Sequence, residues 1–103
     1  MTLSELGKFS EPGLFILVSL ANGPKHGYAM MEDIESLTGV KPGPGTLYGA
    51  LARLEERGLI EALPSEERRR PYRLTPAGLV ALREQLSSLE LFVNAGLQRL
   101  ASQ

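Results

Sequence analysis

The chain has 103 residues, of which 43% are hydrophobic, and its 11 Lys and Arg against 12 Asp and Glu give a formal net charge of −1. This size suits one small domain, and the balanced charge argues against a protein that coats nucleic acid indiscriminately, although not against a site-specific binder. The sequence has no Cys and a single histidine, His26, which excludes disulfides and Cys- or His-based metal clusters within one chain, so no metal and no cofactor are expected.

The first predicted helix is Gly13–Ala21, after a short leader at residues 1–9. Ser10, Glu11 and Pro12 are typical of a helix start. The helix is apolar almost all round, which predicts that it is central, or lies between the core and a second subunit. The run is too short to span a bilayer and no signal peptide pattern precedes it. A soluble cytoplasmic protein is therefore expected.

The second predicted helix, Tyr28–Leu37, follows a stop at Asn22–Pro24. Its side facing water carries Glu32, Asp33 and Glu35. Its inner side is expected to contain Ala29 or Met30, Ile34 and Leu37. Only a short segment separates it from the next helix, and two short helices joined in this way form a helix-turn-helix pattern.

The third predicted helix lies within Pro42–Ile60 and is entered by a Pro-Gly-Pro-Gly turn. Its apolar residues recur at helical spacing and predict an inward face: Leu47, Ala50, Leu51 and Leu54. The other faces are small, polar and basic, and Gly58 ends the helix. Such a helix can lay its outer face in a DNA groove. An ordinary amphipathic surface helix fits this stretch equally well.

A hairpin is predicted next, with strands at Leu59–Leu63 and Tyr72–Leu74 and a charged loop at Pro64–Arg70 between them. A hairpin after a helix-turn-helix is what a winged helix requires. The loop contains three consecutive arginines, Arg68–Arg70. Charge runs usually belong to solvated loops, but the position of this run, at the tip of a hairpin beside a candidate recognition helix, favours DNA contact.

The last predicted helix begins at Thr75-Pro76 and runs to about Leu100. Its leucines follow a heptad-like seam, and the helix would be longer than a small core is wide. We therefore expect its first half to pack on its own core and its second half on a partner subunit. The alternative is packing back on the Leu14–Leu20 helix of its own chain. The predicted fold is mainly α with a small β-hairpin, a winged helix-turn-helix at residues 10–75 with a C-terminal dimerisation helix at 76–103.

Three motifs make the chain similar to the PadR family of bacterial transcriptional regulators, and together they cover roughly Leu14 to Leu82. They are Gly27-Tyr28, then Gly45-Thr46-Leu47-Tyr48 continuing to Leu54-Glu55 and Gly58-Leu59-Ile60, and finally Arg69-Arg70-Pro71-Tyr72-Arg73-Leu74-Thr75 with Gly78. The single C-terminal helix resembles that of the smaller family members.

The resemblance implies a winged-helix homodimer that binds a palindromic operator and usually represses. It implies dimerisation through the C-terminal helix, often with the first helix, and in some members release of DNA by a small aromatic or drug-like molecule near the dimer interface. Two departures are Gly43, where a Ser is frequent, and Gly49, where a Pro is frequent. Gly49 lies inside the predicted helix, where glycine lowers helix stability by about 1 kcal/mol relative to Ala.

The candidate DNA-binding residues lie in or near the predicted helix-turn-helix and wing. Thr46 and Tyr48 begin the recognition helix, where hydroxyl and free N–H groups can meet phosphate or base edges; Tyr48 can instead anchor the helix as a partly buried ring. Arg57 is a weaker candidate than Arg53, because neighbouring glutamates compete for it, and His26 is a weak one, since loop histidines are often merely exposed. The set is Tyr28, Lys41, Thr46, Tyr48, Arg53, Arg68, Arg69, Arg70 and His26.

The candidate dimer interface is apolar and lies mainly on the last helix: Leu86, Leu89, Phe92, Val93, Leu97, Leu100 and, on the first helix, Phe15. Phe15, Leu89 and Phe92 are also the candidate residues for an effector pocket, although a dry dimer core explains them more simply.

Two other classes of function compete with this interpretation. An enzyme is not expected, because the glycines at 43, 45 and 49 do not have the spacing or preceding strand of a nucleotide-binding loop and the one His has no nucleophile setting. A winged helix that binds protein rather than DNA is the stronger rival, supported by the sequence pI of about 5.8 and by Glu32, Asp33, Glu35, Glu55 and Glu56. It would be favoured if these acids interleave with the cationic residues on one surface.

Overall fold

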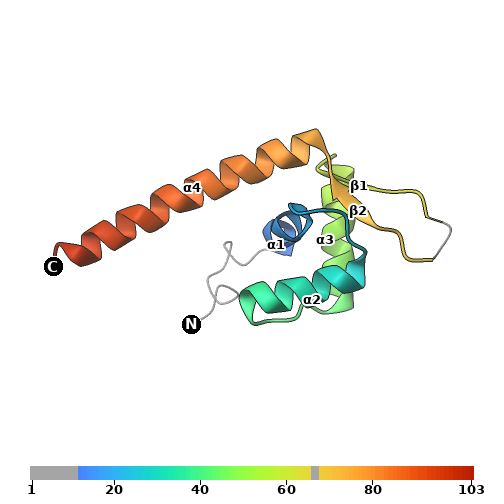
Figure 1. Cartoon of the computed structure of the whole chain (residues 1–103), viewed down its shortest axis with the longest axis horizontal. Coiled ribbons are helices and arrows are strands. Elements are labelled where there is room, and N and C mark those ends of the chain that lie inside the picture. Colours follow the sequence, from blue (N-terminus) through green and yellow to red (C-terminus); the bar gives the residue numbers. More distant parts are fainter. Residues whose placement is uncertain (1–11, 66–67) are drawn as a thin grey trace.

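The computed structural model describes residues 12–65 and 68–103, and within them it is mainly helical with one small antiparallel sheet (Figure 1). The predicted fold class and order of elements are confirmed. The predicted leader and the helix start at Ser10 and Glu11 lie outside the described residues. The elements are α1 (Pro12–Leu20), α2 (Gly27–Thr38), α3 (Pro44–Glu56), β1 (Ile60–Ala62), β2 (Tyr72–Leu74) and α4 (Pro76–Ala101).

The core forms where α1 packs against α2, α3 and the start of α4. The four apolar residues of α3 predicted to face inward, Leu47, Ala50, Leu51 and Leu54, are all buried. In α2 the inner side is formed by Met30, Met31 and Ile34. The prediction that Leu37 belongs to this side is wrong. Leu37 is 54% exposed, because it lies in the last turn of α2, at the margin of the buried face.

The wing strands are short but extended by further main-chain bonds. Ile60 pairs with Leu74 and Ala62 with Tyr72. The amide of Leu63 also donates to the carbonyl of Pro71 at 2.8 Å, so pairing continues past the ends of the strands. On the other edge of β2, Lys25 forms a two-bond bridge with Tyr72. The loop between α1 and α2 is therefore joined directly to the wing.

The start of α4 is attached closely to the end of α3. Thr75 caps α4 by accepting from the amide of Gly78 at 3.0 Å, and its hydroxyl donates to the carbonyl of Gly58 at 2.6 Å. A Cβ atom at Gly78 would lie 1.9 Å from the carbonyl oxygen of Leu59. Only a glycine allows the two backbones to approach so closely.

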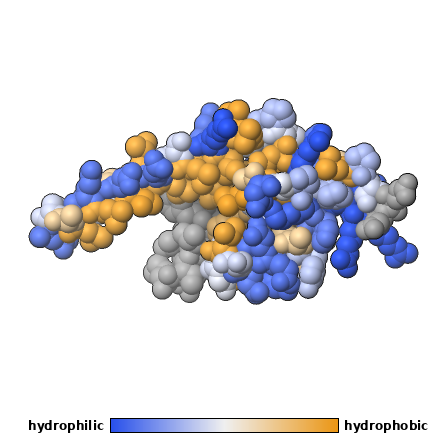
Figure 2. Space-filling view, in the orientation of Figure 1, coloured by the Kyte–Doolittle hydropathy of each residue, from blue (hydrophilic) through white to orange (hydrophobic). Residues whose placement is uncertain are grey.

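The 26 residues of α4 span about 39 Å at 1.5 Å per residue, and the helix extends well beyond the core (Figure 1). Gly78 and Leu82 near its start are buried, whereas its residues from Glu90 onward are exposed in the single chain. Figure 2 shows hydrophobic side chains along this projecting part and hydrophilic ones at the wing end of the molecule. None of the helices in the described part of the chain is both long and apolar enough to cross a membrane.

Candidate nucleic-acid interface

The N-terminus of α3 leaves main-chain donors open to solvent. Gly43 occupies the N-cap position in an extended conformation and supplies no side-chain cap, and Pro44 begins the helix. The first N–H groups of a helix have no partner within it, and Gly45 and Thr46 are exposed. The N–H groups of this turn are thus placed to bind an anion such as a phosphate group.

A cleft of about 420 Å³ opens between the start of α2, the start of α3 and the wing. Six of the nine predicted DNA-binding residues line it. No acidic residue is among its lining residues in the part of the chain that the structure describes. The lining residues are His26, Gly27, Tyr28, Met31, Pro44, Tyr48, Arg68, Arg69, Arg70 and Tyr72.

Tyr48 both packs against α2 and lines the cleft. Its ring packs on Gly27 so closely that a Cβ atom there would lie 2.6 Å from the tyrosine hydroxyl. The side chain nevertheless remains half exposed and lines the cleft. Tyr48 therefore fixes the distance between α2 and α3 and also presents a surface to a ligand in the cleft.

Two cationic side chains lie over the ring of Tyr28 on the outer surface. Lys41 Nζ lies 5.4 Å and the Arg69 guanidinium 5.9 Å from the centre of its ring, within the range of cation–π attraction. Lys41 also pairs with Glu32 at 3.4 Å. A hydrogen bond from Tyr28, and then the hydrogen bond and charge of Lys41, lower the pKa of Glu32 from its ordinary value. The same pairing with Glu32 raises the pKa of Lys41.

The remaining predicted DNA-binding residues do not line the cleft. Thr46 faces a separate, smaller cavity of about 150 Å³. Arg53 lies along the exposed side of α3 with Nη1 3.6 Å from the Cβ position that a side chain at Gly49 would have.

His26 lines the cleft and also caps α2, since its Nδ1 accepts from the amide of Ala29 at 3.4 Å. It is half-buried rather than a simple exposed loop residue.

The predicted dimer residues lie mostly on the exposed part of α4. Phe92, Val93, Leu97 and Leu100 are each more than half exposed in the single chain. Phe15 is half-buried and lines the 150 Å³ cavity together with residues of α2 and α3. Leu89 and Phe92 are not among the residues that line this cavity.

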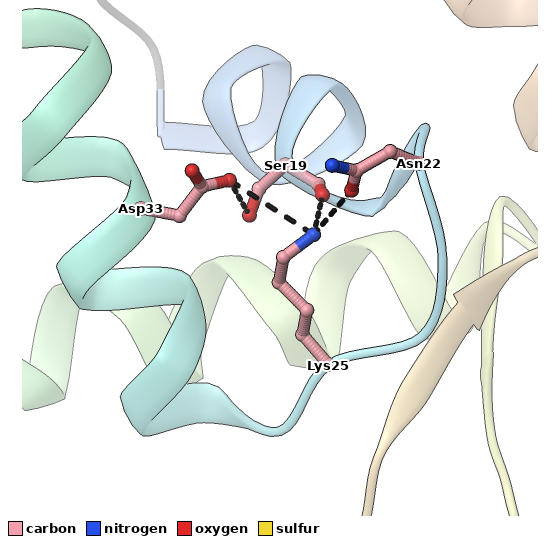
Figure 3. Close-up of polar contacts among 4 residues, drawn as sticks. All are labelled: Ser19, Asn22, Lys25 and Asp33. Atoms are coloured by element: carbon pink, nitrogen blue, oxygen red, sulfur yellow. Dashed lines mark hydrogen bonds and ion pairs between the residues drawn. The ribbon is translucent and has the colours of Figure 1, made fainter.

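A polar network that was not predicted from the sequence joins α1, α2 and the loop between them (Figure 3). Ser19 is buried and donates to Asp33 Oδ2 at 2.7 Å. The ammonium group of Lys25 donates to the carbonyl oxygen of Ser19 and to Asn22 Oδ1. The one signal in the sequence was Ser19, the single polar residue in an otherwise apolar run.

Tyr72 was also missed as a residue of the cleft. It is half-buried, and burial raises its pKa. Its position in the second strand of the wing was predicted, but its approach to the start of α2 depends on how the wing folds back.

The helix-turn-helix of α2 and α3, followed by the β1–β2 hairpin, defines a winged helix. Residues 16–84 match the PadR-like family of transcriptional regulators. The chain therefore belongs to this family, which confirms the resemblance seen in its motifs. The members of the family are transcriptional regulators rather than enzymes, as predicted.

Similarity to individual proteins supports this assignment. The chain is 47% identical over 76 residues to an uncharacterised 37.1 kDa protein in transposon TN4556 of Streptomyces fradiae, covering 74% of this chain but only 22% of that protein. It is 43% identical over 83 residues to the transcriptional regulator Rv3488 of Mycobacterium tuberculosis, covering 75% and 74% of the two chains. The crystal structure of a PadR family transcription regulator from Clostridium difficile R20291 has the same fold, with a TM-score of 0.78, 24% identity, and coverage of 86% and 97%.

Proposed function

We propose that the chain is a DNA-binding repressor that acts as a homodimer on a palindromic operator. The observation that carries the proposal is the cleft between α2, α3 and the wing. Three separate segments contribute His26, three tyrosines and the three wing arginines to it. Arginines of the wing would meet the minor groove or flanking phosphates, while the exposed side of α3 would enter the major groove.

The distribution of charge supports DNA over a protein partner. The glutamates of α2 and α3 do not line the cleft, and Asp33 is engaged by Ser19. Glu32 accepts a hydrogen bond from Tyr28 and is paired with Lys41. The acids therefore do not interleave with the wing arginines in the described part of the chain.

The exposed apolar residues of α4 support dimerisation. Five large hydrophobic side chains within about three turns, Leu91, Phe92, Val93, Leu97 and Leu100, are exposed in the single chain, and burying them between subunits would remove this apolar surface from water. Substituting Leu97 by Glu should convert the dimer to a monomer, as measured by sedimentation, without loss of helical circular dichroism. A wild-type chain that is already monomeric at high concentration would contradict this part of the proposal.

The decisive experiment is selection of bound sequences from random duplex DNA at moderate salt. A recovered palindrome with half-sites about one helical turn apart would support a dimeric DNA reader. The Arg69→Ala variant should bind the recovered duplex more weakly, with the slope of log K against log salt smaller by about 0.9 for each phosphate that the arginine no longer neutralises. Arg99→Ala is the matched control and should bind as the wild type does, because Arg99 lies in the last turn of α4 and this end of the helix is far from the wing (Figure 1).

If the selection enriches no sequence although the protein is well folded, the result would favour a protein partner over DNA.

Release of DNA by a small aromatic or drug-like effector is a separate proposal that rests on the family resemblance and on the cavity beside Phe15. Thermal shifts with a panel of aromatic ligands would test it, and no response across the panel would refute it for those compounds.

A further inference from the structure

Lys25 is the residue at which the end of α1, the start of α2 and the wing are joined. Its ammonium group donates to the carbonyl oxygen of Ser19 in α1 and to Asn22 Oδ1 at 2.5 Å, and it lies 4.0 Å from Asp33 Oδ2 in α2 (Figure 3). Asp33 in turn accepts from the buried hydroxyl of Ser19 at 2.7 Å. The side chain of Lys25 is therefore held by three acceptors from three parts of the chain.

The main chain of the same residue holds the wing. The amide of Lys25 donates to the carbonyl oxygen of Tyr72 at 3.1 Å, and the amide of Tyr72 donates back to the carbonyl oxygen of Lys25 at 2.8 Å. Tyr72 begins β2 and follows the wing arginines by two residues. Any movement of the Lys25 backbone is thus passed to the segment that carries Arg68–Arg70.

The chemistry of the site explains why a cation is required there. The carbonyl groups in the last turn of a helix have no partner within the helix, and a positive charge near them is favourable. The side chain of Lys25 is only 20% exposed and that of Asp33 is 33% exposed, so loss of the lysine would leave the serine carbonyl and the aspartate without their cation. A neutral side chain could not hold the loop in the same way.

We propose that Lys25 is a positioning residue of the DNA interface. It fixes the wing relative to α2 and α3 without touching DNA itself, because its ammonium group is engaged by Ser19 and Asn22 beside Asp33. This inference rests on the proposed DNA-binding function. It predicts that affinity falls while the number of phosphates neutralised stays the same.

The test compares Lys25→Met with Lys41→Met, measuring the affinity for the selected duplex as a function of salt at a temperature where all variants are folded. Lys41 is 41% exposed on the outer surface and is a candidate phosphate contact. Lys25→Met should weaken binding roughly 2- to 30-fold with an unchanged salt slope. Lys41→Met should reduce the slope by about 0.9 for each subunit. Lys25→Arg, which keeps the cation, should restore most of the affinity.

Two results would overturn the inference. A salt slope reduced by Lys25→Met as much as by Lys41→Met would make Lys25 a phosphate contact. If Lys25→Met binds the duplex with wild-type affinity and is only less stable, Lys25 has a purely structural role. If Lys25→Met does not fold, Asn22→Ala removes one acceptor of the ammonium group and should show the same pattern more weakly.

Hydrogen exchange separates failure of this inference from failure of the proposed function. In free Lys25→Met protein the amide of Tyr72 should exchange faster than in the wild type, while the buried amides of α3 keep their protection. Unchanged exchange at Tyr72 would refute the positioning role even if the protein binds DNA. If the Tyr72 amide exchanges faster in Lys25→Met but the wild-type protein binds no duplex, the link between Lys25 and the wing is supported and only the DNA-binding proposal is refuted.

Discussion

Replacing Gly78 by Ala should destabilise the protein, although the same change usually stabilises a helix. The added Cβ atom would lie 1.9 Å from the carbonyl oxygen of Leu59, whereas such contacts are essentially never closer than 3.0 Å. The start of α4 must therefore move by about 1.1 Å. This movement breaks or stretches the bonds from the Thr75 amide to Leu59 at 3.1 Å and from the Thr75 hydroxyl to Gly58 at 2.6 Å.

The expected loss follows from the size of these terms. Overpacking lowers the free energy of unfolding by about 1–3 kcal/mol, and each weakened hydrogen bond lowers it by about 1 kcal/mol. The higher helix propensity of alanine raises it by about 1 kcal/mol. The net loss in the free energy of unfolding is roughly 2–4 kcal/mol. For a domain of this size it corresponds to a fall in Tm of about 8–32 °C.

Thermal unfolding followed by circular dichroism measures this effect, at one protein concentration for all variants because dimerisation would make Tm concentration-dependent. Gly49→Ala is the matched control. The nearest atom to its new Cβ is Arg53 Nη1 at 3.6 Å, an ordinary contact, so this variant should gain up to about 1 kcal/mol. The reasoning about Gly78 would be refuted if Gly78→Ala were at least as stable as the wild type.

Three further predictions concern the core and the exposed ion pairs. Leu51→Ala should lower the free energy of unfolding by about 2–5 kcal/mol, measured by urea denaturation, because the side chain is fully buried. In an NMR titration of the Glu32 carboxyl group, Tyr28→Phe and Lys41→Met should each raise the midpoint, because a hydrogen bond from Tyr28, and the hydrogen bond and charge of Lys41, lower its pKa. The stability that these interactions contribute is present at neutral pH and should be lost as the pH falls through the lowered pKa. Arg73→Met should change stability by less than about 1 kcal/mol, since its ion pair across the wing is exposed; a larger loss in the same denaturation assay would contradict this.

The arrangement of the fold could be predicted from local sequence patterns. The spacing of Leu47, Ala50, Leu51 and Leu54 is enough to define the buried face of α3, because helical periodicity places these residues on one side whatever they pack against. The hairpin and the start of α4 were likewise marked by strand alternation and by Thr75-Pro76. The family motifs then indicated how these elements assemble.

Only the tertiary structure shows which of the predicted DNA-binding residues come together in the cleft. The wing returns to the start of α2 through the bridge between Lys25 and Tyr72, and this brings the arginines to the cleft with Tyr28 and Tyr48 while Thr46 faces elsewhere. Ser19, Lys25 and Asp33 come from segments whose approach depends on how α1 packs on α2. Local periodicity determines which face of a helix is buried. It does not determine which polar groups of different segments come within hydrogen-bonding distance, because that depends on the packing of the whole core.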